Sequence, residues 1–119
     1  MTQTLIIESK QPLMKRLFDF VRRLDAEIGV EQAFLFGSTA KKRRRKNSDV
    51  DIIIVSRGFE DMPENKRQGF VQHRWRYVED MEALTYTPEE FQAMKERVLM
   101  KEILAYAIDL TEGLQTKPC

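Results

Sequence analysis

The spacing of apolar residues changes several times along this chain, and each spacing predicts a different element. From Ser9 to Gly29 the apolar residues recur at three- and four-residue steps, which predicts a helix with one apolar side. Pro12 suits the first turn of this helix, and Gly29 suits its C-terminal end. The short apolar run at residues 5–7 fits either an added edge strand or a frayed terminus, and both interpretations stay open.

Two short apolar segments follow this helix. Residues 32–36 predict a first strand. Residues 49–55 predict a second strand, which is apolar on both faces beyond its carboxylates, as is typical of a central strand covered on two sides. Between them, residues 37–47 form a polar loop with room for a short helix.

The second half of the chain continues the alternation of helices and strands. Residues 57–63 contain a glycine and a proline that interrupt regular secondary structure. The spacing of apolar residues in 64–80 predicts a helix. Residues 81–86 predict a third strand. A last helix then begins with Thr87 as its N-cap, Pro88 in its first turn and Glu90 closing a capping box, and it ends near Gly113.

The order helix, strand, loop, strand, helix, strand, helix predicts a small α/β or α+β domain. We expect a mixed sheet of three to four strands flanked by helices. A length of 119 residues is typical of one domain, so residues 1–119 are expected to form a single unit.

The amino-acid composition is typical of a soluble globular protein. Hydrophobic residues make up 42% and charged residues 33%, and the sequence has neither a run of 18 apolar residues nor the pattern of a signal peptide. We therefore expect no membrane span and a cytoplasmic location. The single cysteine, Cys119, excludes an internal disulfide and a cysteine metal site. The single histidine, His73, likewise excludes a site built from several histidines, and we expect it on a helix surface.

The net charge of +1 conceals an uneven distribution. Residues 41–46, KKRRRK, hold six of the 20 Lys and Arg residues, so the 19 acidic residues outnumber the basic residues elsewhere. Four interpretations of this block stay open: a solvated loop, a chance resemblance to a nuclear-localisation signal, a group of side chains that binds triphosphate, or a docking patch for an acidic or RNA partner. A general nucleic-acid-binding surface would spread its basic residues along one face, so nucleic acid binding is expected only through this block.

The second predicted strand begins with two carboxylates that are candidates for a functional site. Asp49 and Asp51 are separated by one residue, so their side chains point to the same face of a strand, roughly 7 Å apart. Two such carboxylates repel each other unless a cation lies between them, and oxygen ligands suit Mg²⁺ or Mn²⁺. Gly37 and Ser38, at the end of the preceding strand, offer an accessible backbone and a hydroxyl to a phosphate. Together these residues indicate a nucleoside triphosphate site.

These residues also carry a family resemblance. The segment from Gly37 and Ser38 through ten residues to Asp49, Val50 and Asp51 resembles the signature of the DNA polymerase β-like nucleotidyltransferases, in their short stand-alone form, the minimal nucleotidyltransferases. The later segment MEALTYTPEEF, residues 81–91, resembles the third active-site strand of that family and the helix after it.

The resemblance implies a third carboxylate. Glu82 lies where the family has an Asp or, less often, a Glu, and Asp80 is its competitor because it shares the same strand face. By resemblance, Asp49, Asp51 and Glu82 would bind two Mg²⁺ ions, and Glu82 could act as general base. Gly37 and Ser38 would bind the β- and γ-phosphates.

The implied function is transfer of a nucleoside monophosphate, AMP from ATP, to a hydroxyl acceptor. Stand-alone members of the family resemble antitoxins that adenylylate a helical HEPN-type toxin, so a tyrosine of such a partner is a candidate acceptor. Antibiotic adenylylation usually needs a second domain and ranks lower. The alternative is a non-catalytic module that binds nucleotide or masks a partner with the same fold. Homo- and hetero-oligomers both remain open, and so do the acceptor and the base that is selected.

Overall fold

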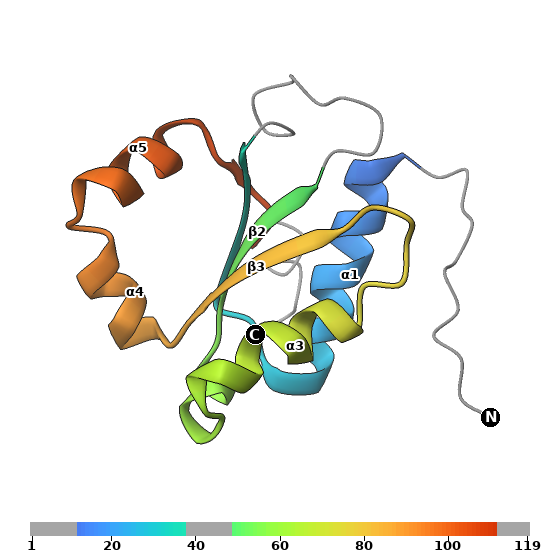
Figure 1. Ribbon diagram of the computed structural model, residues 1–119, viewed down its shortest axis with the longest axis horizontal. Coiled ribbons are helices and arrows are strands. Elements are labelled where there is room, and N and C mark those ends of the chain that lie inside the picture. Colours follow the sequence, from blue (N-terminus) through green and yellow to red (C-terminus); the bar gives the residue numbers. More distant parts are fainter. Residues whose placement is uncertain (1–11, 38–48, 112–119) are drawn as a thin grey trace, which may run out of the picture.

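The computed structural model describes residues 12–37 and 49–111, which fold into a four-stranded mixed sheet with helices on both faces (Figure 1). In chain order the elements are α1 Leu13–Ile28, β1 Gln32–Phe36, β2 Val50–Val55, the 3₁₀ helix η1 Arg57–Asp61, α3 Glu64–His73, β3 Met81–Tyr86, α4 Pro88–Met94, α5 Val98–Tyr106 and β4 Ile108–Asp109. The predicted fold class is confirmed. The runs at 5–7 and 41–46, Ser38, and Gly113 lie outside the described residues.

The strand order in the sheet is β3-β2-β1-β4. The β2–β3 pair is parallel, whereas β1 pairs antiparallel with both β2 and β4. Helices α1 and α3 cover one face, and α4 and α5 lie on the other (Figure 1). Strand β2 is therefore the inner strand that the sequence predicts, and its Ile52, Ile53 and Ile54 are all fully buried.

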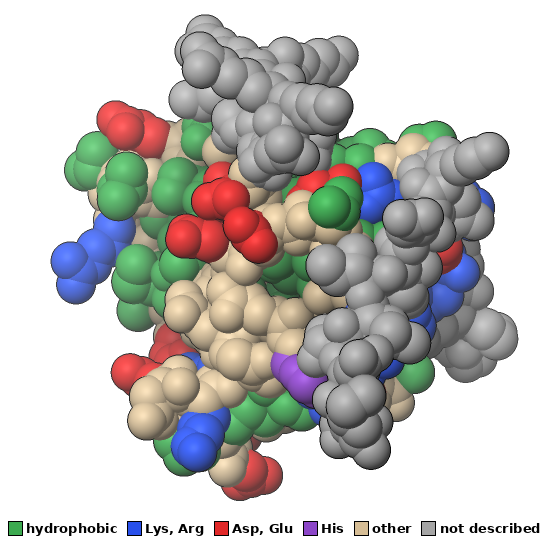
Figure 2. All heavy atoms as spheres, turned by 45° about the vertical axis from the view of Figure 1, so that its right-hand side comes forward, with side chains coloured by type: hydrophobic (Ala, Val, Ile, Leu, Met, Phe, Trp, Pro, Cys, Tyr) green, Lys and Arg blue, Asp and Glu red, His purple; other side chains and the backbone are tan. Residues whose placement is uncertain are grey.

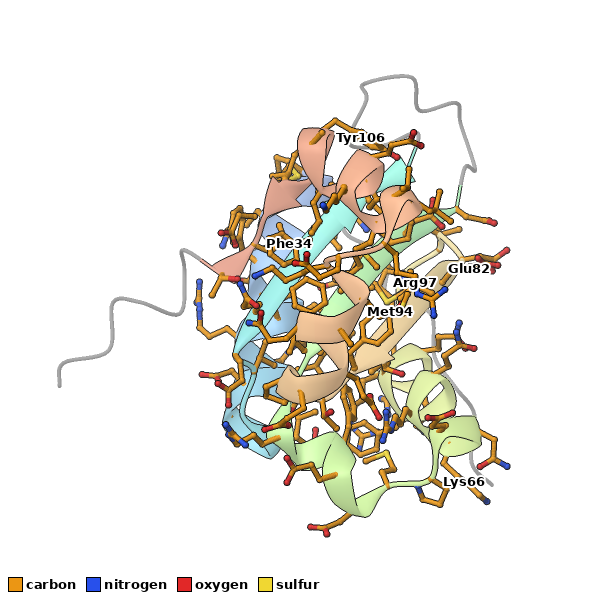
Figure 3. The ribbon with its side chains drawn as sticks, turned by 90° about the vertical axis from the view of Figure 1, so that its left-hand side faces the viewer. Phe34, Lys66, Glu82, Met94, Arg97 and Tyr106 are labelled. Atoms are coloured by element: carbon orange, nitrogen blue, oxygen red, sulfur yellow. The ribbon has the colours of Figure 1, made fainter. Side chains whose placement is uncertain are left out.

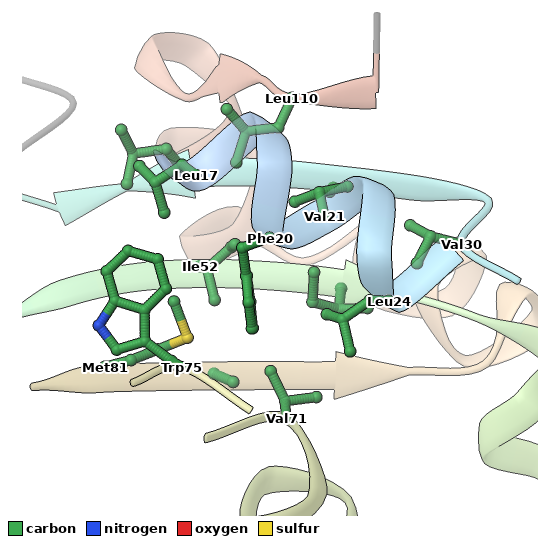
Figure 4. Close-up of a cluster of buried hydrophobic side chains, with 14 of the residues drawn as sticks. Leu17, Phe20, Val21, Leu24, Val30, Ile52, Val71, Trp75, Met81 and Leu110 are labelled. Carbon is green, nitrogen blue, oxygen red and sulfur yellow. The ribbon is translucent and has the colours of Figure 1, made fainter. Parts of the chain in front are cut away.

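The larger core lies between α1, α3 and the sheet. Leu17, Phe20, Val21 and Leu24 of α1 point into it, as the close-up shows (Figure 4). Full burial of each such side chain stabilises the fold by about 1.5–3 kcal/mol. Helix α1 matches the predicted helix and ends at Gly29, which has a φ of 75°.

The helix predicted for residues 64–80 is wrong in its second half, because α3 ends at His73. Trp75 leaves the helical path and packs edge-on against Phe20, with ring centroids 5.3 Å apart. Its Nε1 donates a hydrogen bond to the Glu79 carbonyl at 2.9 Å. Val78 is 67% exposed, so the apparent helical repeat does not mark a packed side. Tertiary packing of the indole overrides the local pattern.

The single last helix that the sequence predicts is also wrong, because α4 and α5 are separate. The capping box at the start of α4 is confirmed: Glu90 N donates to Thr87 Oγ1 at 3.2 Å, and Thr87 N donates to Glu90 Oε1 at 2.9 Å. Phe91 and Met100, however, both pack on the same sheet face. Nine residues of continuous helix turn by about 900°, which would place these side chains on opposite sides. The break lets both reach the sheet.

The residues after α5 add a strand that the sequence analysis assigned to helix. Strand β4 pairs with β1 in the register Phe34 to Asp109 and Leu35 to Ile108. The Ala33 N–H donates to Thr111 Oγ1 at 2.9 Å, and Leu110 N donates to the Ala33 carbonyl at 2.8 Å. In the described ranges, no helix has the length and apolar character needed to cross a membrane.

A buried ion pair joins α1 to the segment before β3. Arg16 Nη1 and Nη2 donate to Glu79 Oε1 and Oε2 at 2.8 and 2.9 Å, and the guanidinium lies 4.8 Å from the centroid of the Tyr77 ring. Both charged residues are 8% exposed. This bidentate pair therefore fixes the position of the chain three residues before Glu82.

We predict that Arg16→Met lowers the free energy of unfolding by about 2 kcal/mol, because it leaves a buried carboxylate without its bidentate partner. Arg22→Met, on the same helix, is the matched control, since Arg22 forms an exposed pair with Asp19 at 3.6 Å. Such exposed pairs contribute about 0–1 kcal/mol. Urea denaturation of both variants checks this, and equal losses would contradict it.

Candidate active site

Three carboxylates lie at one end of the two parallel strands. Asp51 of β2 is directly paired with Glu82 of β3. Adjacent strands lie about 5 Å apart, so these two side chains are neighbours on one face of the sheet. Asp49 immediately precedes β2 and, two residues from Asp51, projects to the same face. That face is the one that α4 and α5 cover, because Ile53 and Val55 of the same alternation pack against them.

The electrostatics of Asp51 reflect this arrangement. Asp51 is half-buried, whereas Asp49 and Glu82 are exposed. Burial raises the pKa of the Asp51 carboxyl, and the neighbouring carboxylates of Glu82 and Asp49 raise it further. The three predicted acidic residues therefore interact electrostatically, which is the arrangement that favours a bound cation. A space-filling view shows acidic side chains gathered at the surface of the molecule (Figure 2).

Gly37 follows β1 and contacts the central carboxylate of the group. Its φ is 75°, and a Cβ atom added there would lie 2.1 Å from Asp51 Oδ2 and 3.0 Å from Asp51 Cγ. A side chain at position 37 is therefore incompatible with the observed position of Asp51. Gly37 is predicted from the sequence to let a phosphate approach the backbone, and in the structure it lies close to Asp51. Ser38 cannot be placed beside it, since it lies outside the described residues.

Asp80, the competitor of Glu82, lies just before β3. Its carbonyl accepts a hydrogen bond from Val50 N at 2.8 Å. Asp49, Asp80 and Glu82 together line a polar hollow of about 450 Å³. Of the two candidates, Glu82 is the residue paired with Asp51 and the one that affects its pKa. This geometry favours Glu82 as the third carboxylate, and its role stays a prediction.

The donor set suits a hard cation, since all three side chains offer carboxylate oxygens. Within residues 12–37 and 49–111, no three His, Cys, Asp or Glu side chains lie close enough together to enclose a metal ion as they stand. Asp49 and Glu82 are exposed side chains next to the half-buried Asp51. The residues therefore fit a divalent ion by their chemistry and strand positions, with a change of side-chain rotamer.

The aromatic residues divide between core and surface. Trp75 is buried, and Tyr77 packs on it with ring centroids 4.7 Å apart, so core packing is the observed role of both. Tyr86 is half-buried on the same sheet face as Glu82. His73 is exposed at the end of α3.

One ion pair near the C-terminal end of β3 was not predicted from the sequence. Arg67 of α3 and Glu90 of α4 form an ion pair at 2.7 Å beside a second hollow, which borders the end of β3. Two-residue alternation from Glu82 predicts that Leu84 and Tyr86 share its face. No local signal, however, brings α3 and α4 together.

Comparison with known proteins gives a family and a fold. A family model described as a nucleotidyltransferase domain matches residues 14–112. No match was found among curated protein sequences.

Three solved structures share the fold at low sequence identity. One is a proposed nucleotidyltransferase from Sulfolobus solfataricus, with a TM-score of 0.58, 18% identity, and coverage of 82% of this chain and 78% of that one. A toxin–antitoxin structure with AMP-PNP has a TM-score of 0.55 and 16% identity, and the match covers 78% and 71% of the two chains. A mutant of the toxin–antitoxin MntA-HpeT has a TM-score of 0.51 and 15% identity, with coverage of 83% and 72%.

The family match spans the sheet, the helices on both faces and the strand pair that carries the acidic residues. The chain therefore belongs to the nucleotidyltransferase domain family and is a nucleotidyltransferase.

Proposed function

We propose that this nucleotidyltransferase transfers AMP from ATP to a hydroxyl group, with two Mg²⁺ ions bound by Asp49, Asp51 and Glu82. The observation that carries the proposal is the register of the parallel strands, which pairs Asp51 with Glu82. Bound Mg²⁺, or Mn²⁺ in its place, supplies charge for the triphosphate and lowers the pKa of an attacking hydroxyl.

Other roles, phosphate binding and proton acceptance, fall to residues of the chain itself. Asp51 lies between Asp49 and Glu82 and faces the backbone of Gly37. Gly37 leaves the end of β1 open, so that the β- and γ-phosphates can approach the backbone there. Ser38, the next residue, would donate its hydroxyl hydrogen bond to the same phosphates. Glu82, on the outer strand of the site, would accept the proton of the acceptor hydroxyl.

We also propose that the acceptor belongs to a partner protein, as in an antitoxin that modifies its toxin. Two of the structural neighbours are toxin–antitoxin structures, and one was solved with AMP-PNP. A helical HEPN-type protein is the candidate partner. These neighbours support ATP as the donor and a protein as the acceptor.

The direct test is transfer of radiolabelled AMP from ATP to a co-purified partner, with Mg²⁺ present or removed by chelation. We expect label on the partner only with Mg²⁺, and a loss of at least 100-fold in Asp49→Asn and Asp51→Asn. Asp61→Asn is the control, since Asp61 is an exposed carboxylate of η1, which follows the opposite end of β2 from Asp51. Partner binding without any labelling by the parent chain would favour the non-catalytic module.

Gly37→Ala should abolish Mg²⁺-dependent ATP binding, because its Cβ would displace the Asp51 carboxylate. Gly29→Ala is a matched control: Gly29 has the same φ of 75°, and a Cβ there meets nothing within 4 Å. Both variants carry a backbone cost of about 1–2 kcal/mol. Calorimetric titration with MgATP separates them, and equal retention of binding would contradict the site.

Asp51→Asn should raise the melting temperature by a few degrees at neutral pH without divalent ions. Burial and the adjacent carboxylates raise the pKa of Asp51, so the folded state binds more protons than the unfolded state between the two pKa values. Stability is therefore lost as pH rises from the unfolded pKa through the folded pKa, and the cost is complete above the folded pKa. Asparagine removes this cost. Melting curves from pH 4 to 8 check this, and a gain that persists at the acidic end would contradict it.

A further inference from the structure

A third hollow lies on the α1 side of the sheet, away from the acidic residues. It has a volume of about 240 Å³ and is formed by helix α1 and the residues that follow α3. We call it the arginine hollow, and its lining residues are Phe20, Arg23, Leu24, Glu27, Arg74 and Arg76. The proposed active site lies instead on the sheet face that α4 and α5 cover. Figure 3 faces that other side, with Glu82 of β3 and Met94 of α4 labelled.

The charges around the arginine hollow do not balance. Arg74 Nη2 and Nε donate to Glu27 Oε1 and Oε2 at 2.6 and 2.8 Å, so these two charges form a bidentate pair. The guanidinium groups of Arg23 and Arg76 are exposed, and within residues 12–37 and 49–111 they have neither a hydrogen-bond nor an ion-pair partner. The hollow therefore carries an excess of two positive charges, which favours an anion.

The inner wall of the hollow is apolar and well packed. Phe20 is fully buried and Leu24 is 1% exposed, and both belong to the larger core (Figure 4). The guanidinium of Arg74 lies 3.5 Å from the centroid of the Phe70 ring, and its Nη1 donates to the Phe70 carbonyl at 2.9 Å. An anion in the hollow therefore has an apolar wall on one side, where charges attract each other more strongly than in open water.

The size of the hollow and the charges beside it favour a single acidic group. Sites for drug-sized molecules have volumes of about 300–1,000 Å³, so this hollow suits one side chain. A nucleic-acid strand would need basic residues that continue along the surface. On α1, however, acidic residues lie on both sides of Arg23 in the sequence. Asp19 pairs with Arg22 at 3.6 Å, and Asp25 accepts a hydrogen bond from Val30 N at 2.8 Å. A polyanion would be repelled by these carboxylates, whereas one acidic side chain would not reach them.

We propose that the arginine hollow is a docking site for an acidic segment of a partner protein, and that Arg23 and Arg76 bind an aspartate or glutamate carboxylate of that segment. A planar guanidinium presents paired N–H donors that match the two oxygens of a carboxylate. Arginine is also one of the residues that contribute most to protein–protein binding. The docking site is separate from nucleotidyl transfer, because Asp51 and Glu82 lie on the opposite face of the sheet.

The test is a titration with acetyl-hexaglutamate amide, followed through the fluorescence of Trp75, the single tryptophan of the chain. Trp75 packs edge-on against Phe20, which lines the hollow, so its emission should change when the peptide binds there. Arg23→Gln and Arg76→Gln should each weaken binding about tenfold, because each removes a charge-assisted hydrogen bond. Arg22→Gln is the matched control, since it removes the same charge from a neighbouring residue that does not line the hollow, and binding should stay unchanged.

A second measurement locates the peptide on the surface. The NMR signals of the Nε–H groups of Arg23 and Arg76 should shift with hexaglutamate and stay in place with hexaglutamine. No saturable binding by the parent chain, or arginine signals that do not move, would overturn the docking site. Equal weakening by Arg22→Gln and Arg23→Gln would also overturn it, because binding would then follow net charge alone.

Competing ligands and the nucleotide site complete the test. Tighter binding of a 12-nucleotide oligothymidylate or of inorganic phosphate, with the same two arginine signals shifted, would overturn the protein partner in favour of nucleic acid or free phosphate. The melting temperature and the calorimetric binding of MgATP should be the same in Arg23→Gln, Arg76→Gln and the parent, because both side chains are exposed and lie away from the acidic residues. Loss of MgATP binding in either variant would contradict the separation of the two sites.

Discussion

The parallel pairing of β2 with β3 is the constraint on which the site depends. It brings together two residues that are 31 positions apart in the chain, Asp51 and Glu82, and it places them as direct partners on one face. A shift of the register by one residue would turn Glu82 to the opposite face, where Ala83 is now buried in the larger core. The apolar positions of both strands thus determine where the carboxylates lie.

Holding like charges together opposes folding, and the surrounding packing offsets that cost. Strand β2 is buried on both faces, with Ile52 and Ile54 toward α1 and Ile53 and Val55 toward α4 and α5. The bidentate pair of Arg16 with Glu79 holds the approach to β3 from the other side. The repulsion that Glu82 and Asp49 exert on Asp51 therefore acts on a strand that its buried neighbours hold in place.

The elements that sequence patterns predicted well are those with local signals. Helix α1, strands β1 and β3 and the capping box at Thr87 follow from spacing, propensity and turn chemistry. The errors occurred where distant residues decide the local structure. Trp75 ends the helical path because Phe20 lies across from it, and the last helix breaks because Phe91 and Met100 share one sheet face. The proximity of Asp49, Asp51 and Glu82 could be predicted by spacing and family resemblance, and their role stays a prediction. The Arg67–Glu90 pair could not, since it depends on how α3 and α4 meet.

The two edge strands of the described sheet affect how other protein chains can associate with it. One edge strand, β4, has only two residues. On the other edge strand, β3, Ala83 is fully buried, and the Met81 carbonyl accepts a hydrogen bond from Gln72 Nε2 at 2.7 Å. Short or covered edge strands disfavour the addition of a strand from another molecule. Other proteins are therefore expected to recognise this nucleotidyltransferase through the surfaces of its helices, and crowding at high protein concentration should not drive it into fibrils built on this sheet.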